Sequence, residues 1–344
     1  MIRTVILDWG DTVMRNLPYP GPMAKWPRVE AVPGAAEALR DLRGRCQVVL
    51  ATNAADSGEA LVRQALARVG LEGYFDAVLT ARELGARKPE PAFFQAVLDT
   101  TATAPNETAM VGDDYAADIA GPKALGLRSV WFNPLARHCP APAPLHDAEL
   151  QAMADLPALL RRPFLPDVAE CLALLVAHDA PPQVLAHVQA VAALAFRLAE
   201  HLRSRGVAVD PLLTHRGGLL HDLDKITAWR SGRVHGQLGA ELLRSAGYPE
   251  LATIVERHLM FTILDAEHRP VTWEEKLVFY ADKVVEGECI VSLEARLEAL
   301  SRRYPEHGER MRACLPAMQA LEAEVCASLG VSQAELARLA GRER

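Results

Sequence analysis

The sequence lacks the features of thiol-based metal sites, of secreted proteins and of membrane proteins. Only six of 344 residues are cysteine, and none forms a C-x-x-C pair, which predicts reduced thiols rather than disulfides or a zinc knuckle. Apolar runs such as Val184–Leu198 are interrupted by polar residues before they reach the ~18 residues that a membrane span needs. The N-terminal run Thr4–Leu7 ends at Asp8 and is too short for a signal peptide. We therefore expect a cytoplasmic protein without a membrane partner.

The sequence also lacks a block of basic residues. There are 37 Lys and Arg against 44 Asp and Glu, which gives a net charge of −7. Proteins that bind duplex nucleic acid carry a basic surface, so no nucleic-acid duplex is expected as a partner. Half of the residues are hydrophobic and 24% are charged, as in folded domains. The length predicts two or three domains of about 100–200 residues each.

The pattern of apolar residues changes near residue 165. Before it, short apolar runs alternate with amphipathic stretches, which predicts a doubly wound parallel sheet covered on both faces. The expected strands are Thr4–Leu7, Gln47–Thr52, Phe75–Thr80, Ala109–Gly112 and Ser129–Phe132. After Pro166 only helical spacing is found. We predict an α/β domain over 1–162, a linker at Arg161–Pro166, and an all-α domain over 163–344.

Four polar side chains lie at the ends of predicted strands or in the loops that come after them. Asp8 ends the first strand, Thr52 ends the second, Lys88 precedes a proline, and Asp113 follows the fourth strand. Ligands of doubly wound sheets bind at the carboxyl ends of the strands. A nucleophilic carboxylate, a hydroxyl, an ammonium group and an acidic cluster can together hold Mg²⁺ and a phosphoryl group. We therefore expect these residues to form one site.

In these segments the first 160 or so residues resemble the haloacid dehalogenase-like superfamily. The resemblance implies that Asp8 is the nucleophile, which becomes an aspartyl-phosphate. It implies that Thr52 and Lys88 bind the phosphate. It also implies that Mg²⁺ is held by Asp8, by the backbone carbonyl of Gly10 and by Asp113, with support from Asp118.

Gly10 departs from the family pattern, because phosphatases of this family carry a general-acid Asp at that position. General acid catalysis contributes about 10²–10⁴-fold, so the domain is expected to be a weak or specialised phosphatase, or a module that senses a phosphorylated ligand without turnover. Asp11 is a candidate substitute acid. The stretch from Thr12 to Pro33 is short and rich in proline, so no helical cap is expected and the site should be open unless the second domain shields it.

A second group of polar residues lies in the C-terminal half. The dipeptide His-Asp occurs three times; we interpret the pairs at 146–147 and 178–179 as surface residues, and His201, His215, His268 and His307 as solvated. The third pair lies near further histidines and a later aspartate, which together form the candidate set His187, His221, Asp222, His235, His258 and Asp282. These six residues lie on five predicted helices. Imidazole and carboxylate ligands on several helices suit a divalent Fe, Mn, Co, Zn or Ni ion.

This set resembles the HD-domain metal-dependent phosphohydrolases over roughly residues 184–296. The family motif H…HD…D matches His187, His221-Asp222 and Asp282, and the two further histidines match members that hold two metals. The resemblance implies hydrolysis of phosphoester bonds, with Asp222 as the bridging ligand. Lys225 either neutralises phosphate charge or pairs structurally with Asp222 or Asp224.

The two resemblances together predict a two-domain phosphohydrolase that acts on nucleotides or other small phosphorylated metabolites. Three alternatives remain open. The second site can be a di-iron oxygenase centre, as in some relatives. The first domain can be a non-catalytic sensing module. The chain can also be an interaction scaffold in which both sites are vestigial.

Overall fold

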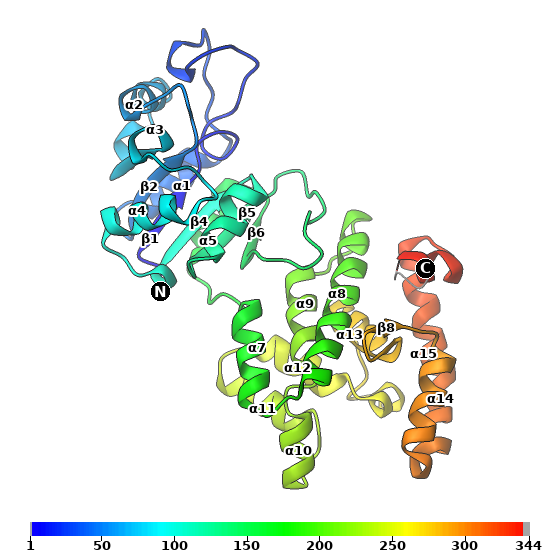
Figure 1. The fold of residues 1–344 in the computed structure, drawn as a ribbon. Helices are drawn as coiled ribbons and strands as arrows, with labels where there is room; N and C mark the ends of the chain where they lie inside the picture. Colours follow the sequence, from blue (N-terminus) through cyan, green and yellow to red (C-terminus); the bar gives the residue numbers. More distant parts are fainter. Residues whose placement is uncertain (1, 340–344) are drawn as a thin grey trace. The chain divides into compact units, whose positions relative to one another are not determined.

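The computed structural model describes residues 2–339, which form two compact units (Figure 1). The first unit runs to Phe164 apart from Pro142–Pro144, and the second contains that tripeptide and the residues from Leu165 onward. The division falls two residues after the expected boundary between 162 and 163. Each unit has its own hydrophobic core.

The first unit is built on a parallel sheet with the strand order β3-β2-β1-β4-β5-β6. The strands are β1 (Thr4–Leu7), β2 (Gln47–Thr52), β3 (Ala77–Thr80), β4 (Thr108–Gly112), β5 (Arg128–Phe132) and β6 (Ala148–Leu150). The helices are α1 (Ala35–Leu42), α2 (Glu59–Ala67), α3 (Ala81–Leu84), α4 (Pro91–Thr101), α5 (Gly121–Lys123) and α6 (Leu156–Leu160), with a π-helical turn at Tyr115–Ala120. Because β1 pairs with both β2 and β4, the strand order reverses beside β1, where ligands of doubly wound sheets bind.

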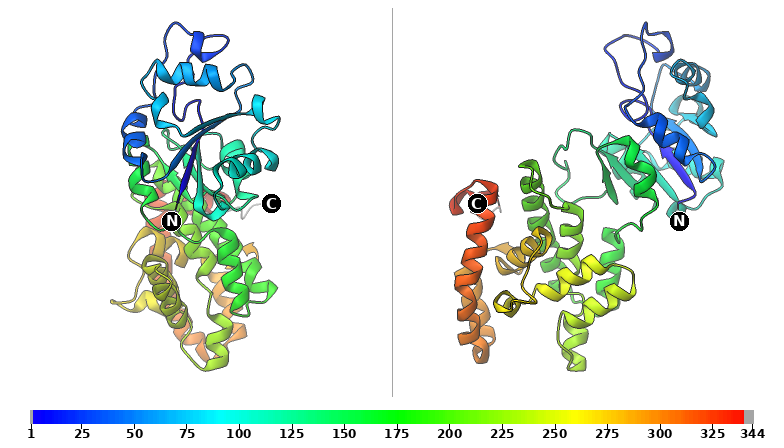
Figure 2. Two further views of the ribbon diagram at one scale, coloured as in Figure 1. Left: turned by 90° about the vertical axis from the view of Figure 1, so that its left-hand side faces the viewer. Right: turned by 180° about the vertical axis from the view of Figure 1, so that it is seen from behind.

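The strands are buried on both faces because successive side chains point to opposite sides. Val5 and Leu7 pack in the core cluster that includes residues of α1 and α2, whereas Ile6 packs in the cluster that includes residues of α4. Figure 2 shows helices on both sides of the sheet. The predicted doubly wound sheet is confirmed. The sixth strand was not predicted, since β6 has three residues, too few to show a pattern.

The second unit is mainly helical. Its helices are α7 (Val168–Ala177), α8 (Pro182–Ser204), α9 (Pro211–Leu220), α10 (Lys225–Ser231), α11 (Gln237–Ser245), α12 (Pro249–Arg257), α13 (Trp273–Lys283), α14 (Leu293–Arg303), α15 (Gly308–Leu329) and α16 (Gln333–Leu339). Pro182 is the first residue of α8, where its missing N–H has no helical partner anyway. Helix α8 packs against both α9 and α13.

The prediction that no strand follows Pro166 is wrong. Val285–Glu286 (β7) and Cys289–Ile290 (β8) pair antiparallel around Gly287, whose φ of 61° lies in the left-handed region that glycine tolerates. Each strand has two residues, so neither can show the alternation that identifies a strand in a sequence. This small hairpin supplies a backbone contact to the second site.

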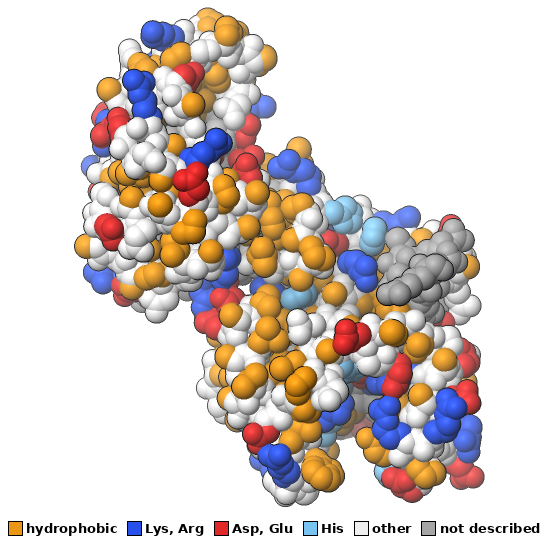
Figure 3. All heavy atoms as spheres, viewed as in Figure 1, with side chains coloured by type: hydrophobic (Ala, Val, Ile, Leu, Met, Phe, Trp, Pro, Cys, Tyr) orange, Lys and Arg blue, Asp and Glu red, His pale blue; other side chains and the backbone are white. Residues whose placement is uncertain are grey.

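The surface carries charges of both signs. On the face drawn in Figure 3, blue and red side chains are interspersed among hydrophobic ones on each unit. Among residues 2–339, no helix is both long enough and apolar enough to cross a bilayer.

Candidate functional site

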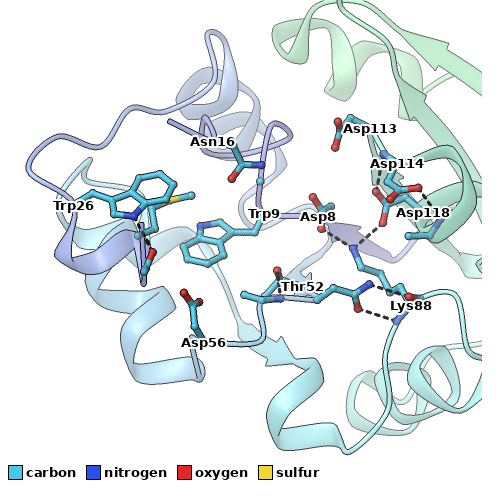
Figure 4. Close-up of a pocket in the computed structure, with 16 residues that line it drawn as sticks. Asp8, Trp9, Asn16, Trp26, Thr52, Asp56, Lys88, Asp113, Asp114 and Asp118 are labelled. Carbon is cyan, nitrogen blue, oxygen red and sulfur yellow. Dashed lines mark hydrogen bonds and ion pairs between the residues drawn. The ribbon is translucent and has the colours of Figure 1, made fainter. Parts of the chain in front are cut away.

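The first candidate site lies at the carboxyl edge of the sheet in the first unit. Asp8 follows β1, Thr52 ends β2 and Asp113 follows β4, so parallel packing brings their side chains together. These residues, Gly10 and Lys88 line a cavity of about 410 Å³ (Figure 4). The structure therefore brings together every residue predicted for this site.

Lys88 links two of the carboxylates. Its Nζ atom lies 2.5 Å from Asp8 Oδ1 and 2.6 Å from Asp118 Oδ1 (Figure 4), and its side chain is almost fully buried. Burial alone would lower the pKa of Lys88, but the charges of Asp8 and Asp118 hold it above its ordinary value. Asn53 fixes the backbone of Lys88 by accepting from its N–H and donating to its carbonyl, both at 2.8 Å. Lys88 is therefore a fixed cation beside Asp8.

Asp118 positions Lys88 rather than offering a free ligand atom. Its Oδ1 accepts from Lys88, and its Oδ2 accepts from the backbone N–H of Asp114 at 3.1 Å. The close approach requires glycine at position 112, because a Cβ there would lie 2.1 Å from Asp118 Oδ2. This arrangement agrees with the supporting role expected for Asp118.

Negative charge concentrates around Asp8 and Asp113. Oxygen atoms of Asp8, Asp113 and Asp118 all lie within 4.8 Å of one another. Burial, together with the charges of Asp8 and Asp11, raises the pKa of Asp113 to about 6. Crowded carboxylates of this kind suit a hard divalent cation such as Mg²⁺. Asp114 does not join them, because its Oδ1 caps the following turn by accepting from two backbone N–H groups.

Neither Gly10 nor Asp11 supplies an acid. A Cβ on Gly10 would lie 2.5 Å from Asn16 Nδ2, so Asn16 occupies the space of the missing side chain. The Asp11 carboxylate accepts from the backbone and side-chain N–H groups of Asn16 at 2.9 and 3.0 Å. Asp11 is not among the residues that line the cavity. The substitute-acid interpretation of Asp11 therefore has no support in the geometry.

The proline-rich segment forms no cap domain, but it lines one side of the cavity. The proline-rich segment carries Met23 and Trp26 against the cavity. Arg68 holds this segment by donating to the backbone carbonyls of Ala24 and Trp26 at 3.0 and 2.6 Å. One short turn of 3-10 helix at Met23–Lys25 is its only regular structure. A wall without a cap domain is formed in this way, because hydrogen bonds from one arginine to two backbone carbonyls can order a segment that has almost no helix.

The second candidate site joins the six residues predicted from the C-terminal half. Only His187, on α8, and Asp282, on α13, lie within helices; the others follow helix ends or lie in a loop, which corrects the prediction of five ligand-bearing helices. His221 and His258 are the residues directly after α9 and α12, Asp222 follows His221, and His235 precedes α11.

The six residues form two adjacent groups of three. Within each group, made of His187, His221 and Asp282 or of Asp222, His235 and His258, the ligand atoms lie within 4.8 Å of one another. Asp222 lies between the groups, with Oδ1 2.9 Å from His235 Nε2 and Oδ2 3.7 Å from His221 Nε2. This position suits the bridging role predicted for Asp222.

Three histidines present Nε2 to the cluster because backbone carbonyls hold Nδ1. The Nδ1 atoms donate to carbonyls as follows: His187 to Gly287 at 3.1 Å, His221 to Gly218 at 2.8 Å and His258 to Val255 at 2.6 Å. A carbonyl only accepts, so the proton is on Nδ1, and Nε2 of the neutral ring carries a lone pair.

The Nε2 atoms of His187 and His221 lie beside the Asp282 carboxylate. His221 Nε2 is buried and has no hydrogen-bond partner among the described residues. His187 Nε2 lies 3.1 Å from Asp282 Oδ1; because Nδ1 already carries a proton, this contact needs either a second ring proton or a metal ion between the two atoms. The donor set therefore fits one or two divalent metal ions.

His235 is held differently from the other histidines. Its Nδ1 lies 2.6 Å from Asp224 Oδ1, and its Nε2 lies 2.9 Å from Asp222 Oδ1. Burial would lower its pKa, but the hydrogen bonds to Asp222 and Asp224 raise the pKa of His235 to about 9. In the absence of metal, a proton therefore holds this part of the cluster together.

Sequence reasoning missed two residues that orient these ligands. Asp224 is fully buried and also accepts from the backbone N–H groups of Gly236 and Gly239 at 2.9 and 2.8 Å. Lys283 donates to Asp282 and to the His258 carbonyl, so it fixes one oxygen of Asp282. A signal for Asp224 was present, since it lies two residues after Asp222 and directly follows Leu223 at the end of an apolar run. Nothing in the sequence marks the role of Lys283.

Lys225 pairs with Asp222 rather than with Asp224. Its Nζ lies 2.5 Å from Asp222 Oδ2, and its side chain is 44% exposed. The ammonium group is thus held at the edge of the cluster while it remains accessible from solvent.

Two expectations about other histidines are wrong. His146 and Asp147 are buried: Tyr115 Oη lies 3.0 Å from His146 Nδ1, and Asp147 pairs with Lys123 and Arg128. His215 is also buried, with its Nδ1 2.7 Å from Arg216 Nη1. Polar groups of this kind satisfy one another in the core, and no spacing in the sequence announces such pairs.

Two family models match the segments in which the two candidate sites lie. A family model for haloacid dehalogenase-like hydrolases matches residues 8–126, and a family model for the HD domain matches residues 184–286. The first match begins at Asp8 and contains Thr52, Lys88 and Asp113. The second contains all six residues of the second cluster.

Three curated relatives show partial similarity. An uncharacterized protein of Methanocaldococcus jannaschii is 35% identical over 131 residues, which is 35% of this chain and 76% of that protein. A ribulose-1,5-bisphosphate 5-phosphatase of Halopiger xanaduensis is 38% identical over 104 residues, covering 30% of this chain and 42% of that enzyme. A phosphoserine phosphatase of Thermus thermophilus is 38% identical over 108 residues, covering 31% and 40%. The chain thus spans about two fifths of the length of these two phosphatases.

Proposed function

Because its first unit belongs to the haloacid dehalogenase-like hydrolases and its second unit carries an HD domain, we propose that this chain is a phosphohydrolase with two active sites. Its substrates are nucleotides or other small phosphorylated metabolites. The observation that carries the proposal is the second cluster, in which backbone carbonyls aim three imidazole Nε2 atoms at two buried carboxylates. The names of two relatives, both phosphatases of small metabolites, support the substrate class.

In the second unit, His187, His221 and Asp282 would hold one divalent ion, and Asp222, His235 and His258 a second. Fe, Mn, Co, Zn and Ni suit these ligands. Bound ions supply Lewis-acid activation of a phosphate ester and of water. The chain's own residues orient the ligands, and Lys225 at the rim meets the charge of the substrate phosphate. The exposed ammonium group of Lys225 beside Asp222 is suited to this task.

In the first unit, Asp8 is the proposed nucleophile. A carboxylate oxygen of Asp8 attacks phosphorus, and the bond to the leaving group breaks with its electron pair on the leaving oxygen. Water then hydrolyses the aspartyl-phosphate. Lys88 and Thr52 bind phosphate oxygens, and Asp8, Asp113 and the Gly10 carbonyl would hold Mg²⁺, which neutralises charge at the phosphoryl group. Turnover is slow because no acid replaces the one missing at Gly10.

The absence of that acid also favours a second function for the first unit. Asn16 fills the space beside Gly10 and binds Asp11, so the site is built to do without a proton donor. A module that binds a phosphorylated ligand without turnover would have the same features.

A screen of phosphorylated metabolites with single-site variants tests the proposal. We expect Asp282→Ala to remove the main, transition-metal-dependent hydrolysis and Asp8→Asn to remove only the slow Mg²⁺-dependent part. Asp99→Asn, on the exposed part of α4, is the matched control. If neither variant changes hydrolysis, the proposed sites are wrong. If Asp282→Ala binds phosphorylated ligands but cleaves none, the sensing function replaces catalysis at Asp8. Iron-dependent O₂ uptake would identify the second site as an oxygenase instead.

A further inference from the structure

The cavity of the first site has two chemically different sides. Lys88, Thr52, Asp8, Asp113 and Asp118 lie at one side. Trp9, Met23 and Trp26 line the other, with the carboxylate of Asp56 beside them (Figure 4); we call Trp9, Met23 and Trp26 the indole wall. Figure 4 shows both indoles on the side away from Asp113 and Asp118. A phosphate at Asp8 would therefore have its leaving group near the indole wall.

Hydrogen bonds and a ring contact hold Trp26 in its place in the indole wall. Trp26 donates from Nε1 to the Gly21 carbonyl at 2.8 Å, and its own carbonyl accepts from Arg68 at 2.6 Å. The rings of Tyr19 and Trp26 pack with centroids 5.9 Å apart. A preformed apolar surface binds a flat apolar group without the cost of ordering side chains.

Trp9, one residue of this wall, has an indole N–H that the described part of the protein leaves without an acceptor. Its indole Nε1 is buried and has no partner among residues 2–339. Buried indole N–H groups ordinarily find an acceptor. A bound group with an acceptor atom would supply the missing partner.

The missing acid points to the same kind of ligand. Without a proton donor at Gly10, the bond to a leaving group breaks readily only if that group is stable as an anion. Phenolates and other aromatic oxyanions meet this condition, whereas alkoxides do not. The missing acid near Asp8 and the flat indole surfaces at the other side of the cavity therefore favour the same class of substrate, the phosphates of aromatic alcohols.

We propose that the indole wall is a leaving-group subsite, and that the first site takes monophosphates of planar aromatic alcohols that carry a hydrogen-bond acceptor on the ring. This inference rests on the proposed role of Asp8 as nucleophile. Trp9, Met23 and Trp26 act as specificity residues, because they contact the leaving group and not the phosphorus.

The test compares leaving groups in the full-length Asp282→Ala protein with Mg²⁺. Acetate is a better leaving group than naphtholate, so leaving-group chemistry alone ranks acetyl phosphate above 2-naphthyl phosphate. We expect the reverse order in kcat/KM. Trp26→Ala should lower kcat/KM for 2-naphthyl phosphate at least about tenfold and change that for acetyl phosphate less than about twofold. Trp229→Ala, at an 80% exposed tryptophan of the second unit, is the control and should change neither.

The donor of Trp9 is tested with the three acetyl-substituted phenyl phosphates. At least one isomer should have a lower KM than phenyl phosphate, and Trp9→Phe, which keeps a ring and removes the N–H, should abolish that difference. If Trp26→Ala does not fold by circular dichroism, Trp26→Leu replaces it. Equal losses for both substrates in the Trp26 variant, or no preferred acetyl isomer, would overturn the inference.

Failure of the nucleophile is separable from failure of the subsite. If Asp8→Asn cleaves aryl phosphates as fast as its parent does, the proposed role of Asp8 is wrong. Calorimetry with phenylphosphonate and methylphosphonate then tests the indole wall without turnover. Tighter binding of phenylphosphonate, lost in the Trp26 variant, supports the subsite; equal binding overturns it.

Discussion

Asp224→Asn should weaken metal binding at the second site without touching a metal ligand. Asp224 accepts from the backbone N–H groups of Gly236 and Gly239 and from His235 Nδ1. An asparagine keeps one acceptor oxygen, which will face the two backbone donors because its NH₂ group cannot accept from them. The NH₂ group then faces His235 Nδ1 and donates to it. The His235 proton must consequently sit on Nε2, the atom that should bind metal.

The size of the effect follows from this change of tautomer. Loss of a partner that orients a metal-binding histidine costs about 10–100-fold in metal affinity, which corresponds to about 1.4–2.7 kcal/mol. The measurement is equilibrium dialysis against Mn²⁺, with Asp113→Asn in every protein so that the first site contributes little. Asp210→Asn is the matched control, because Asp210 also accepts from two backbone N–H groups but contacts no histidine of the cluster. Equal Mn²⁺ affinity in the two variants, with both folded, would refute the reasoning.

Three further predictions concern both sites. Asp222→Ala should abolish hydrolysis by the second unit and lower its metal content, because its two oxygens face both groups of ligands; full metal loading by mass spectrometry would contradict this. The pKa of His235 lies at about 9, above its ordinary value of 6.5, so the metal-free protein should lose stability as pH rises from about 6.5 to about 9, while metal affinity rises over the same window. Thermal melts of the metal-free protein and metal titrations across that pH range measure the two effects. A melting temperature and a metal affinity that do not change with pH would contradict the prediction. Gly10→Asp alone should disturb Asn16, whereas Gly10→Asp with Asn16→Ala should raise alkyl-phosphate turnover more than aryl-phosphate turnover, as steady-state kinetics can measure.

Local patterns in the sequence were enough to predict much of the fold and to pick out most of the residues proposed for the two sites. Buried parallel strands are continuous apolar runs, so five of the six strands of the sheet could be recognised from residue order. Strand ends and helix ends are also local features. That is why Asp8, Thr52, His221 and Asp222 could be assigned to two sites before their neighbours in space were known.

Contacts between distant residues were decided only by the tertiary structure. The carbonyl that sets the tautomer of His187 belongs to Gly287, 100 residues away in a hairpin too short to predict. Asp118 binds Lys88, from which it is separated by 30 positions in the sequence, and Arg68 binds the backbone of Trp26 over a separation of 42 positions. Any backbone carbonyl can accept a hydrogen bond, so residue type gives no sign of which one will be used. Packing brings one particular carbonyl into range, and packing depends on the whole chain.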